Sequence, residues 1–162
     1  MKFKIREMQA SEYGALEIFL YEAIFIPAGA AKPARKIIYQ PELQIYIKNF
    51  GEGTADFCFV AEVENKILGA AWSRIMNDYG HIDDKTPSLA LSVLKNFRRA
   101  GIATALMKNL LEKISAENFR RVSLSVQKEN LPAVNLYKKL DFKIFAENES
   151  EYIMIAGVKN DF

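Results

Sequence analysis

Hydrophobic and polar residues alternate along several short stretches of this chain. In residues 88–93, leucine and valine alternate with serine and alanine, and in residues 2–6, phenylalanine and isoleucine alternate with lysine and arginine. Alternation with a period of two is typical of a strand with one buried face. Similar stretches predict the remaining strands, so about seven are expected. These further strands are residues 57–63, 67–76, 121–126, 142–146 and 151–157.

Between these strands, apolar residues recur with the spacing of a helix. The leucines and isoleucines of residues 102–116 share one helical face. Residues 26–40 and 77–87 are rich in turn-forming or polar residues and are predicted as loops. The other predicted helices are residues 11–25 with Ser11 as the cap, residues 41–50 with Pro41 in the first turn, and residues 131–140.

The order of these elements predicts one α/β domain over residues 1–162. No internal repeat, low-complexity run or linker interrupts the sequence. Residues 88–94, 102–116 and 121–126 form a strand–helix–strand unit. Such a unit makes two neighbouring strands parallel and is expected to have a right-handed crossover.

Composition excludes several classes of partner. The chain carries 22 Lys and Arg residues against 20 Asp and Glu residues, so no strong field attracts nucleic acid or a membrane. Cys58 is the only cysteine, which excludes an internal disulfide and a multi-cysteine metal site. The first residues do not resemble a signal peptide, and no apolar run is long enough to cross a bilayer. We therefore expect a cytoplasmic protein that holds no metal.

The turn that joins the fourth predicted strand to the long helix has the chemistry of an anion site. The first amide N–H groups of a helix lack partners within it, and the aligned peptide dipoles favour negative charge. Gly101 and Ala103 let a phosphate approach the backbone, while Arg98 and Arg99 add charge and Thr104 adds a hydroxyl. The turn therefore suits a diphosphate. It lacks the second glycine and the Lys-Ser/Thr of a P-loop, and it is not the Gly-x-Gly-x-x-Gly of a dinucleotide fold.

Two motifs in this region resemble those of the GCN5-related N-acetyltransferase (GNAT) family. Arg98-Arg99-Ala100-Gly101-Ile102-Ala103 matches that family's pyrophosphate motif, Gln/Arg-x-x-Gly-x-Gly/Ala. Downstream, a strand leads to Asn130, then to Tyr137 on a helix, then to Phe142, as in the family's second signature. The resemblance is sharp over residues 88–142, where both motifs occur in the family's order.

The resemblance implies the fold and activity of this family. The fold is a mixed, mostly antiparallel central sheet of about seven strands flanked by helices. The activity is transfer of the acetyl group of acetyl-CoA, the cosubstrate, to a primary amine of a small molecule or peptide. The amine attacks directly, without a covalent enzyme intermediate. The residues that the resemblance places at coenzyme A are Leu91, Ser92, Val93, Arg98, Arg99, Ala100, Gly101, Ile102, Ala103, Thr104, Asn130 and Tyr137.

Two of these residues also have structural alternatives. The resemblance places Tyr137 near the cofactor sulfur, where a phenol that stays protonated can donate to the departing thiolate. Tyr137 also has helical spacing with Val134 and Leu140, which fits a core position. Asn130 is placed beside the pantetheine arm, and it equally has the position of a cap for the following helix.

Three positions depart from the family's pattern. Lys95 stands where the family often has proline, and Arg99 where it often has glycine. Neither change removes a backbone donor, so cofactor binding is expected to survive. Asp141 replaces the usual glycine before Phe142. Aspartate adopts a left-handed turn more readily than most residues, so we expect that conformation here.

The proton acceptor of the reaction is left open by the sequence. Tyr79, His81, Asp83 and Asp84 precede the strand that is expected to border the acceptor amine. A solvated loop is the alternative for all four. Loops set on a rigid sheet commonly carry specificity, so the acceptor is expected between the loops at residues 26–40 and 77–87.

The sequence also leaves an alternative function and the oligomeric state open. A non-catalytic, coenzyme A-binding regulatory module of the same fold would share the phosphate turn. The last strand, residues 151–157, is predicted as an edge that is available for pairing, which leaves a homodimer open.

Overall fold

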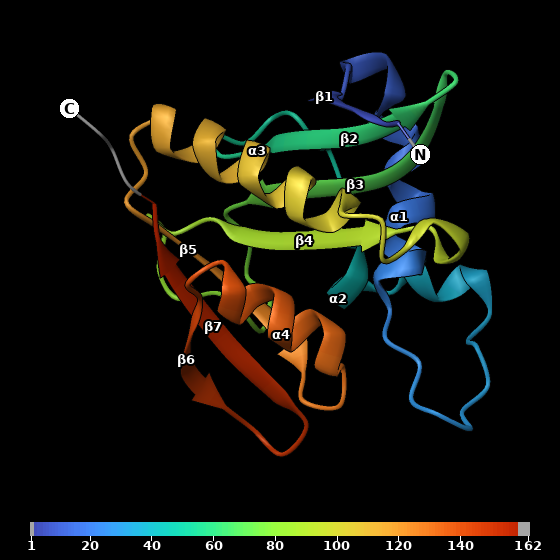
Figure 1. Ribbon diagram of the computed structural model, residues 1–162. Helices are drawn as coiled ribbons and strands as arrows, with labels where there is room; N and C mark the ends of the chain where they lie inside the picture. Colours follow the sequence, from blue (N-terminus) through green and yellow to red (C-terminus); the bar gives the residue numbers. More distant parts are fainter. Residues whose placement is uncertain (1, 159–162) are drawn as a thin grey trace.

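A sheet of seven strands forms the middle layer of the molecule, in the order β1-β2-β3-β4-β5-β7-β6 (Figure 1). The structure is a computed structural model and describes residues 2–158. Neighbouring strands are antiparallel except β4 and β5, which run parallel, so the predicted mixed, mostly antiparallel sheet is confirmed. The strands are β1 (Lys4–Glu7), β2 (Phe57–Val63), β3 (Lys66–Arg74), β4 (Ser88–Val93), β5 (Arg121–Gln127), β6 (Lys143–Glu147) and β7 (Glu151–Gly157).

Helices cover both faces of the sheet (Figure 1). One face carries α3 (Ile102–Ala116) and α4 (Leu131–Lys139), and the other carries α1 (Leu16–Ala23) and α2 (Pro41–Gln44). Among the described residues, no helix has the length and hydrophobicity needed to cross a bilayer. The 3-10 helices of this part of the chain are Ala10–Ala15, Arg35–Tyr39 and Lys95–Phe97.

Strand alternation sorts the buried side chains into two cores. On β4, Leu89 and Val93 pack in the core beneath α3. Ser92 points to the opposite face, where its hydroxyl donates to the carbonyl oxygen of Phe19 in α1 at 2.7 Å. Trp72 of β3 is fully buried in this second core. β4 is therefore anchored on both of its faces.

The predicted helix at residues 41–50 is regular only over α2, and turns follow it. The cause lies in β3. The guanidinium of Arg74 donates to the carbonyl oxygens of Ile45 and Lys48 at 3.0 and 2.8 Å, and the Trp72 indole donates to that of Tyr46 at 3.0 Å. In a continued helix these carbonyls would accept from the following turn. Side chains of β3 thus replace the helix's own hydrogen bonds.

The N-terminal helical segment also begins differently from the prediction. Gln9 rather than Ser11 is the cap, and the Glu12 carboxylate accepts from the Gln9 N–H at 2.8 Å. The first turns are a 3-10 helix, and α1 follows them. Residues 26–40 were expected to be mostly loop, and they include one short 3-10 helix.

The prediction that the last strand is an edge is wrong. β7 lies between β5 and β6 and pairs with both. β6 precedes β7 in a hairpin and takes the outer position, so β1 and β6 are the edges of the sheet. A hairpin can place either of its strands against the rest of a sheet, and local sequence does not decide which.

Candidate functional site

A gap opens between β4 and β5, the parallel pair in the middle of the sheet. These strands pair at Ser88 and Ser123, where the Ser123 N–H donates to the carbonyl oxygen of Pro87 at 3.0 Å. No register partner between the two strands is found beyond this point in the described chain. From Ser88 onward, one edge of β4 therefore faces no strand.

The direction of the β4 backbone shows which groups face this gap. The Leu94 N–H donates to Leu68 of β3 at 2.8 Å. Backbone groups of alternate residues point to the same side of a strand, so Ser92 also faces β3, while Leu91 and Val93 face the gap. The Val93 carbonyl oxygen accepts the Nε–H of Arg98 at 2.9 Å. The N–H groups of Leu91 and Val93 are left for a ligand.

The turn before α3 forms a concave row of amide donors. Gly101 has a φ of +83° and Arg99 a φ of +65°, both in the left-handed region. Such alternation turns successive N–H groups toward one point and makes an anion-binding nest. The first helical bond runs from Ala105 to Gly101 at 3.1 Å, and in residues 2–158 no backbone acceptor is found for the N–H groups of residues 98–104. A Cβ built on Gly101 meets nothing within 4 Å, so there is open space beside this residue for an incoming phosphate.

The side chains of this turn divide between support and exposure. Ile102 is buried in the core and offers only its backbone, whereas Ala103 and Thr104 are partly exposed. The Arg98 guanidinium is half exposed, bonds Val93 and lies 3.8 Å from the Glu22 carboxylate of α1. Its charge therefore sits at the gap and beside the row of amides.

Tyr137 is buried on α4, with its ring centroid 5.7 Å from that of Phe142. Desolvation raises the pKa of its phenol to about 12, which keeps the group protonated at neutral pH. Its hydroxyl has no hydrogen-bond partner among the described residues. The core position is thus confirmed, and the acid role stays a prediction with a protonated, unengaged hydroxyl available for it.

The C-terminal end of α4 has the conformation that the sequence predicts, whereas its N-terminal end lacks the predicted capping bond. Asp141 has a φ of +68°, as predicted for the position where the family has glycine. The Phe142 N–H donates to the Tyr137 carbonyl at 3.0 Å, and the Asp141 N–H to that of Lys138 at 3.1 Å, which closes the helix as a Schellman motif. Asn130 is the N-terminal cap residue by position, but its side chain makes no capping bond. Its amide is therefore available to a ligand.

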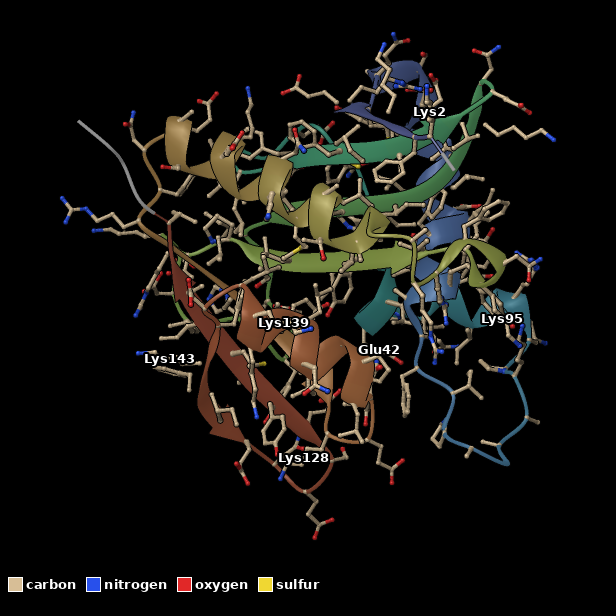
Figure 2. All side chains as sticks on the ribbon, in the orientation of Figure 1. Lys2, Glu42, Lys95, Lys128, Lys139 and Lys143 are labelled. Carbon is tan, nitrogen blue, oxygen red and sulfur yellow. The ribbon has the colours of Figure 1, made fainter. Side chains whose placement is uncertain are left out.

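A pocket of about 600 Å³ lies on the other face of the sheet. Leu124 and Val126 pack beneath α3 and α4, so Ser125 between them points into this opposite face. The lining includes three carboxylates and, among the described residues, neither Lys nor Arg. Lys128, Lys139 and Lys143 lie around α4 and β6, outside this lining (Figure 2). The lining residues are Pro41, Glu42, Leu43, Ile45, Tyr46, Asn77, Asp78, Tyr79, Ser125 and Glu151.

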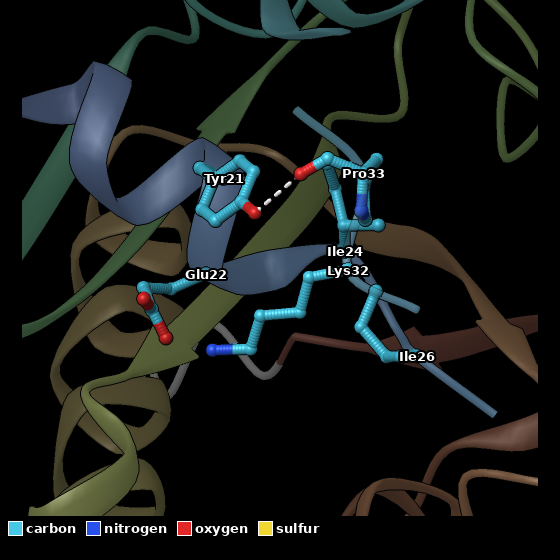
Figure 3. Close-up of a pocket in the computed structure, with 6 residues that line it drawn as sticks. All are labelled: Tyr21, Glu22, Ile24, Ile26, Lys32 and Pro33. Carbon is cyan, nitrogen blue, oxygen red and sulfur yellow. Dashed lines mark hydrogen bonds between the residues drawn. The ribbon is translucent and has the colours of Figure 1, made fainter. Parts of the chain in front are cut away.

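Only one of the two loops expected around the acceptor borders this pocket. Residues 77–79 line it, but its second wall is α2 and the turn after it, not residues 26–40. The 26–40 loop instead folds against the end of α1, where the Tyr21 hydroxyl donates to the Pro33 carbonyl at 2.6 Å (Figure 3). The cavity beneath it, which Glu22 and Lys32 also line, measures about 60 Å³. That volume is well below the roughly 300–1,000 Å³ of small-ligand sites.

Asp78 is a partly buried carboxylate of the large pocket, and both of its oxygens accept hydrogen bonds. Its Oδ2 accepts from the Tyr46 hydroxyl at 3.1 Å, and its Oδ1 accepts from the Ser88 hydroxyl at 2.9 Å. Burial raises the pKa of Asp78, and both hydroxyl donors oppose that rise. The Tyr46 pKa is also raised, first by burial and then by the Asp78 charge.

The four residues considered as proton acceptors from sequence are mostly engaged elsewhere. The Arg121 guanidinium donates to Asp83 at 2.7 Å and holds the pKa of that carboxyl near 2. Asp84 is exposed and lies 3.5 Å from the His81 Nε2. Tyr79 alone borders the large pocket. Asp78, Tyr46 and Glu151 also line the pocket and were not predicted from sequence, because they come from three separate segments.

Within residues 2–158, no group of three or more His, Cys, Asp or Glu side chains is placed to hold a metal ion.

Comparison with known proteins shows the family of this chain. The family model described as acetyltransferase (GNAT) family matches residues 25–142. An N-alpha-acetyltransferase of Sulfurisphaera tokodaii is 33% identical over 125 residues, which cover 68% of this chain and 74% of that protein. The N-alpha-acetyltransferase of Sulfolobus acidocaldarius is 30% identical over 125 residues, covering 68% and 72%.

Solved structures share the fold at low identity. The PaiA N-acetyltransferase of Thermoplasma acidophilum, in complex with coenzyme A, has a TM-score of 0.72 at 16% identity and covers 97% of this chain and 99% of its own. The acetyltransferase yncA of Salmonella typhimurium, with acetyl-CoA, has a TM-score of 0.71 at 12% identity, covering 100% and 97%. These two proteins with the same fold were thus crystallised with coenzyme A and with acetyl-CoA, respectively.

Proposed function

The chain belongs to the acetyltransferase (GNAT) family, and we propose that the acceptor of its acetyl group is the α-amino group at the start of a polypeptide. The chain is an acetyl-CoA-dependent N-acetyltransferase, so the predicted activity and cosubstrate are confirmed. The alternative of a non-catalytic regulatory module is not favoured, because the relatives are named as acetyltransferases.

The proposed placement of acetyl-CoA follows from the donors described above. The diphosphate accepts from the amides of residues 98–104, and the pantetheine arm runs back along the free edge of β4, past Leu91 and Val93. Asn130 lies beside the arm. The Leu91 N–H polarises the thioester carbonyl, and Tyr137 protonates the departing thiolate.

The acceptor proposal is carried by one observation, the pocket of about 600 Å³ on the face of the sheet opposite α3 and α4. We call it the acidic pocket because of its three carboxylates. Glu42, Asp78 and Glu151 line it without a Lys or Arg among its described residues. Carboxylates attract an ammonium group and repel a carboxylate attached next to it. A free amino acid carries such a carboxylate, whereas a polypeptide has a neutral amide there. The volume lies within the roughly 300–1,000 Å³ of small-ligand sites and suits the first residues of a chain. The names of the two archaeal relatives support the same acceptor.

A thiol-release assay with paired peptides tests the proposal. One peptide has a free N-terminus and no lysine, and the other is N-terminally blocked and contains lysine. Free amino acids and a linear polyamine complete the panel. We expect release of coenzyme A with the first peptide and acetylation of its α-amine by mass spectrometry. Faster turnover of the lysine peptide or the polyamine would instead assign a side-chain or small-molecule amine.

The proposal extends to location and assembly. A cytoplasmic location is supported by Cys58, which is free and buried. A homodimer would use the exposed edge strand β6, where Ile144 and Phe145 are 43% and 52% exposed. Sedimentation of wild type against Phe145→Lys measures this directly, and a monomer at all concentrations would remove it.

A further inference from the structure

Within the acidic pocket, one carboxylate differs from the others in its partners. We propose that Asp78 takes the proton that the acceptor ammonium must lose, and that Tyr46 and Ser88 hold it in position for that step. The inference rests on the proposed function in one respect: it takes this pocket as the acceptor site. It does not depend on which amine the acceptor carries.

Asp78 has only neutral hydrogen-bond donors. Tyr46 and Ser88 each donate one hydroxyl, one to each carboxylate oxygen. Elsewhere in the chain, carboxylates with similar contacts face guanidinium groups, and their pKa is lowered: to about 2 for Glu12, beside Arg6, and to about 2 for Asp83. A cation-paired carboxylate is a weak proton acceptor, because protonation breaks the ion pair. Asp78 loses no ion pair when it is protonated.

The holding groups are themselves fixed by the sheet. Two side chains of β3 hold the backbone around Tyr46 by hydrogen bonds. Trp72 donates to the Tyr46 carbonyl oxygen, and Arg74 donates to those of Ile45 and Lys48. Ser88 is the first residue of β4 and is buried. Asp78 is therefore clamped between two rigid elements, which a proton acceptor requires for a reproducible distance to its substrate.

Ser88 also places Asp78 along the gap. β4 and β5 pair at Ser88 and diverge beyond it, so Asp78 lies where the gap begins. The amide row lies at the other end, after Val93. An arm whose diphosphate occupies that row runs back past Val93 and brings its thioester to Leu91, three residues from the Ser88 that holds Asp78.

The other two carboxylates of the pocket lie elsewhere. Glu151, the first residue of β7, accepts from Gln127 at the far end of β5 at 2.9 Å. Glu42 is exposed on α2 (Figure 2). These two attract the ammonium, and Asp78 is left to receive its proton.

The proton balance of the step is complete with these groups. The ammonium gives one proton to Asp78, directly or through one water, and its nitrogen gains a lone pair. That lone pair forms the new C–N bond as the C–S bond breaks. The thiolate takes a proton from Tyr137, the second nitrogen proton restores the phenol through solvent, and Asp78 releases its proton to solvent. One proton is released per acetylation, and no other reactant is needed.

Asp78→Asn tests the step, because asparagine keeps the shape and cannot accept the proton. With the best acceptor of the wild type, we expect kcat/KM to fall about 100-fold or more at neutral pH. The loss should shrink as pH rises and the free amine becomes abundant. Coenzyme A affinity by calorimetry should not change. Glu151→Gln is the matched control and should raise KM while keeping the pH profile.

Ser88→Ala provides a second test, which still applies if Asp78→Asn fails to fold. Removing a donor that lowers the Asp78 pKa should move the acidic limb of kcat/KM to higher pH, as should Tyr46→Phe. A wild-type pH profile in all three variants, with folded protein by thermal melting, would overturn the assignment. These tests can fail independently of the acceptor proposal. They compare each variant with wild type on one acceptor, whereas the peptide panel compares several acceptors with wild type alone.

Discussion

The Nε–H of Arg98 donates to the carbonyl oxygen of Val93 at 2.9 Å. This bond joins the turn before α3 to the last residue of β4. The same guanidinium reaches Glu22 of α1 at 3.8 Å, so three elements meet at one side chain. The amide row and the free edge of β4 are thereby held in a fixed relation.

Arg98→Lys should not replace arginine at this position. Lysine keeps the charge but has no planar group that can bond Val93 while facing a phosphate. We expect both Arg98→Lys and Arg98→Ala to bind coenzyme A about tenfold more weakly, the size expected for a lost charge-assisted bond. Calorimetry measures this, with Lys95→Ala as the exposed control. Wild-type affinity in Arg98→Lys would show that charge alone acts here.

Gly101→Glu should abolish coenzyme A binding. The open space beside Gly101 would receive a carboxylate, directly at the amide row, and the left-handed backbone adds strain. Gly101→Asn is the matched comparison, because asparagine tolerates that conformation and adds bulk without charge, so it should lose less affinity than Gly101→Glu. Equal affinity for wild type and Gly101→Glu in calorimetry would move the diphosphate to another part of the protein.

Tyr137→Phe should lower kcat more than it changes KM. The ring and its contact with Phe142 are kept, so only the hydroxyl is lost. Since burial raises the Tyr137 pKa to about 12, no basic limb from this group is expected below about pH 11. Steady-state kinetics with a thermal melt as the folding control measure both quantities. An unchanged kcat would leave Tyr137 as a core residue only.

Acid should destabilise the protein through Glu12. The Arg6 guanidinium, by two hydrogen bonds of 2.8 Å from its Nη atoms, lowers the Glu12 pKa from an ordinary 4.5 to about 2. A carboxyl whose folded pKa is lowered stabilises the fold above its unfolded pKa, and this contribution is lost as pH falls from 4.5 toward 2. Urea midpoints across that range should fall less in Glu12→Gln than in wild type. Parallel curves for the two proteins would contradict the prediction.

Asp141→Gly should raise stability without affecting turnover. Asp141 has a φ of +68° and is exposed, so its side chain brings strain to the turn and no packing. We expect a gain of up to about 1 kcal/mol in the free energy of unfolding, the scale of the left-handed penalty. Chemical denaturation measures it, and Lys138→Gly, within α4, should instead lose stability. A loss in both would mean that the aspartate makes a contribution beyond the turn.

Local sequence was sufficient where local chemistry decides the structure. The row of amides from Arg98 to Thr104, the turn at Asp141 and the alternation along β4 could all be predicted, because each depends on residues adjacent in the chain. The crossover between β4 and β5 followed from its length alone.

The acidic pocket could not be predicted in the same way. Its residues come together through the order of the strands and through the hydrogen bonds from Arg74 to the turn after α2. These residues are Tyr46, Asp78 and Glu151 of the lining, with Ser88 bonded to Asp78. The same hydrogen bonds from Arg74 end the helix that the apolar spacing predicts at residues 41–50. The inner place of β7 depends in the same manner on which strand of a hairpin meets β5.

In the proposed arrangement, the divergence of β4 and β5 gives the two substrates independent routes into the protein. The proposed nucleotide site lies at the start of α3 and the proposed amine site beside α2, so neither substrate would have to leave before the other arrives. A long polypeptide can extend into solvent without crossing the nucleotide's path. With the two substrates placed as proposed, the acetyl group would cross the layer of strands in one step, without a residue that carries it between two separate half-reactions.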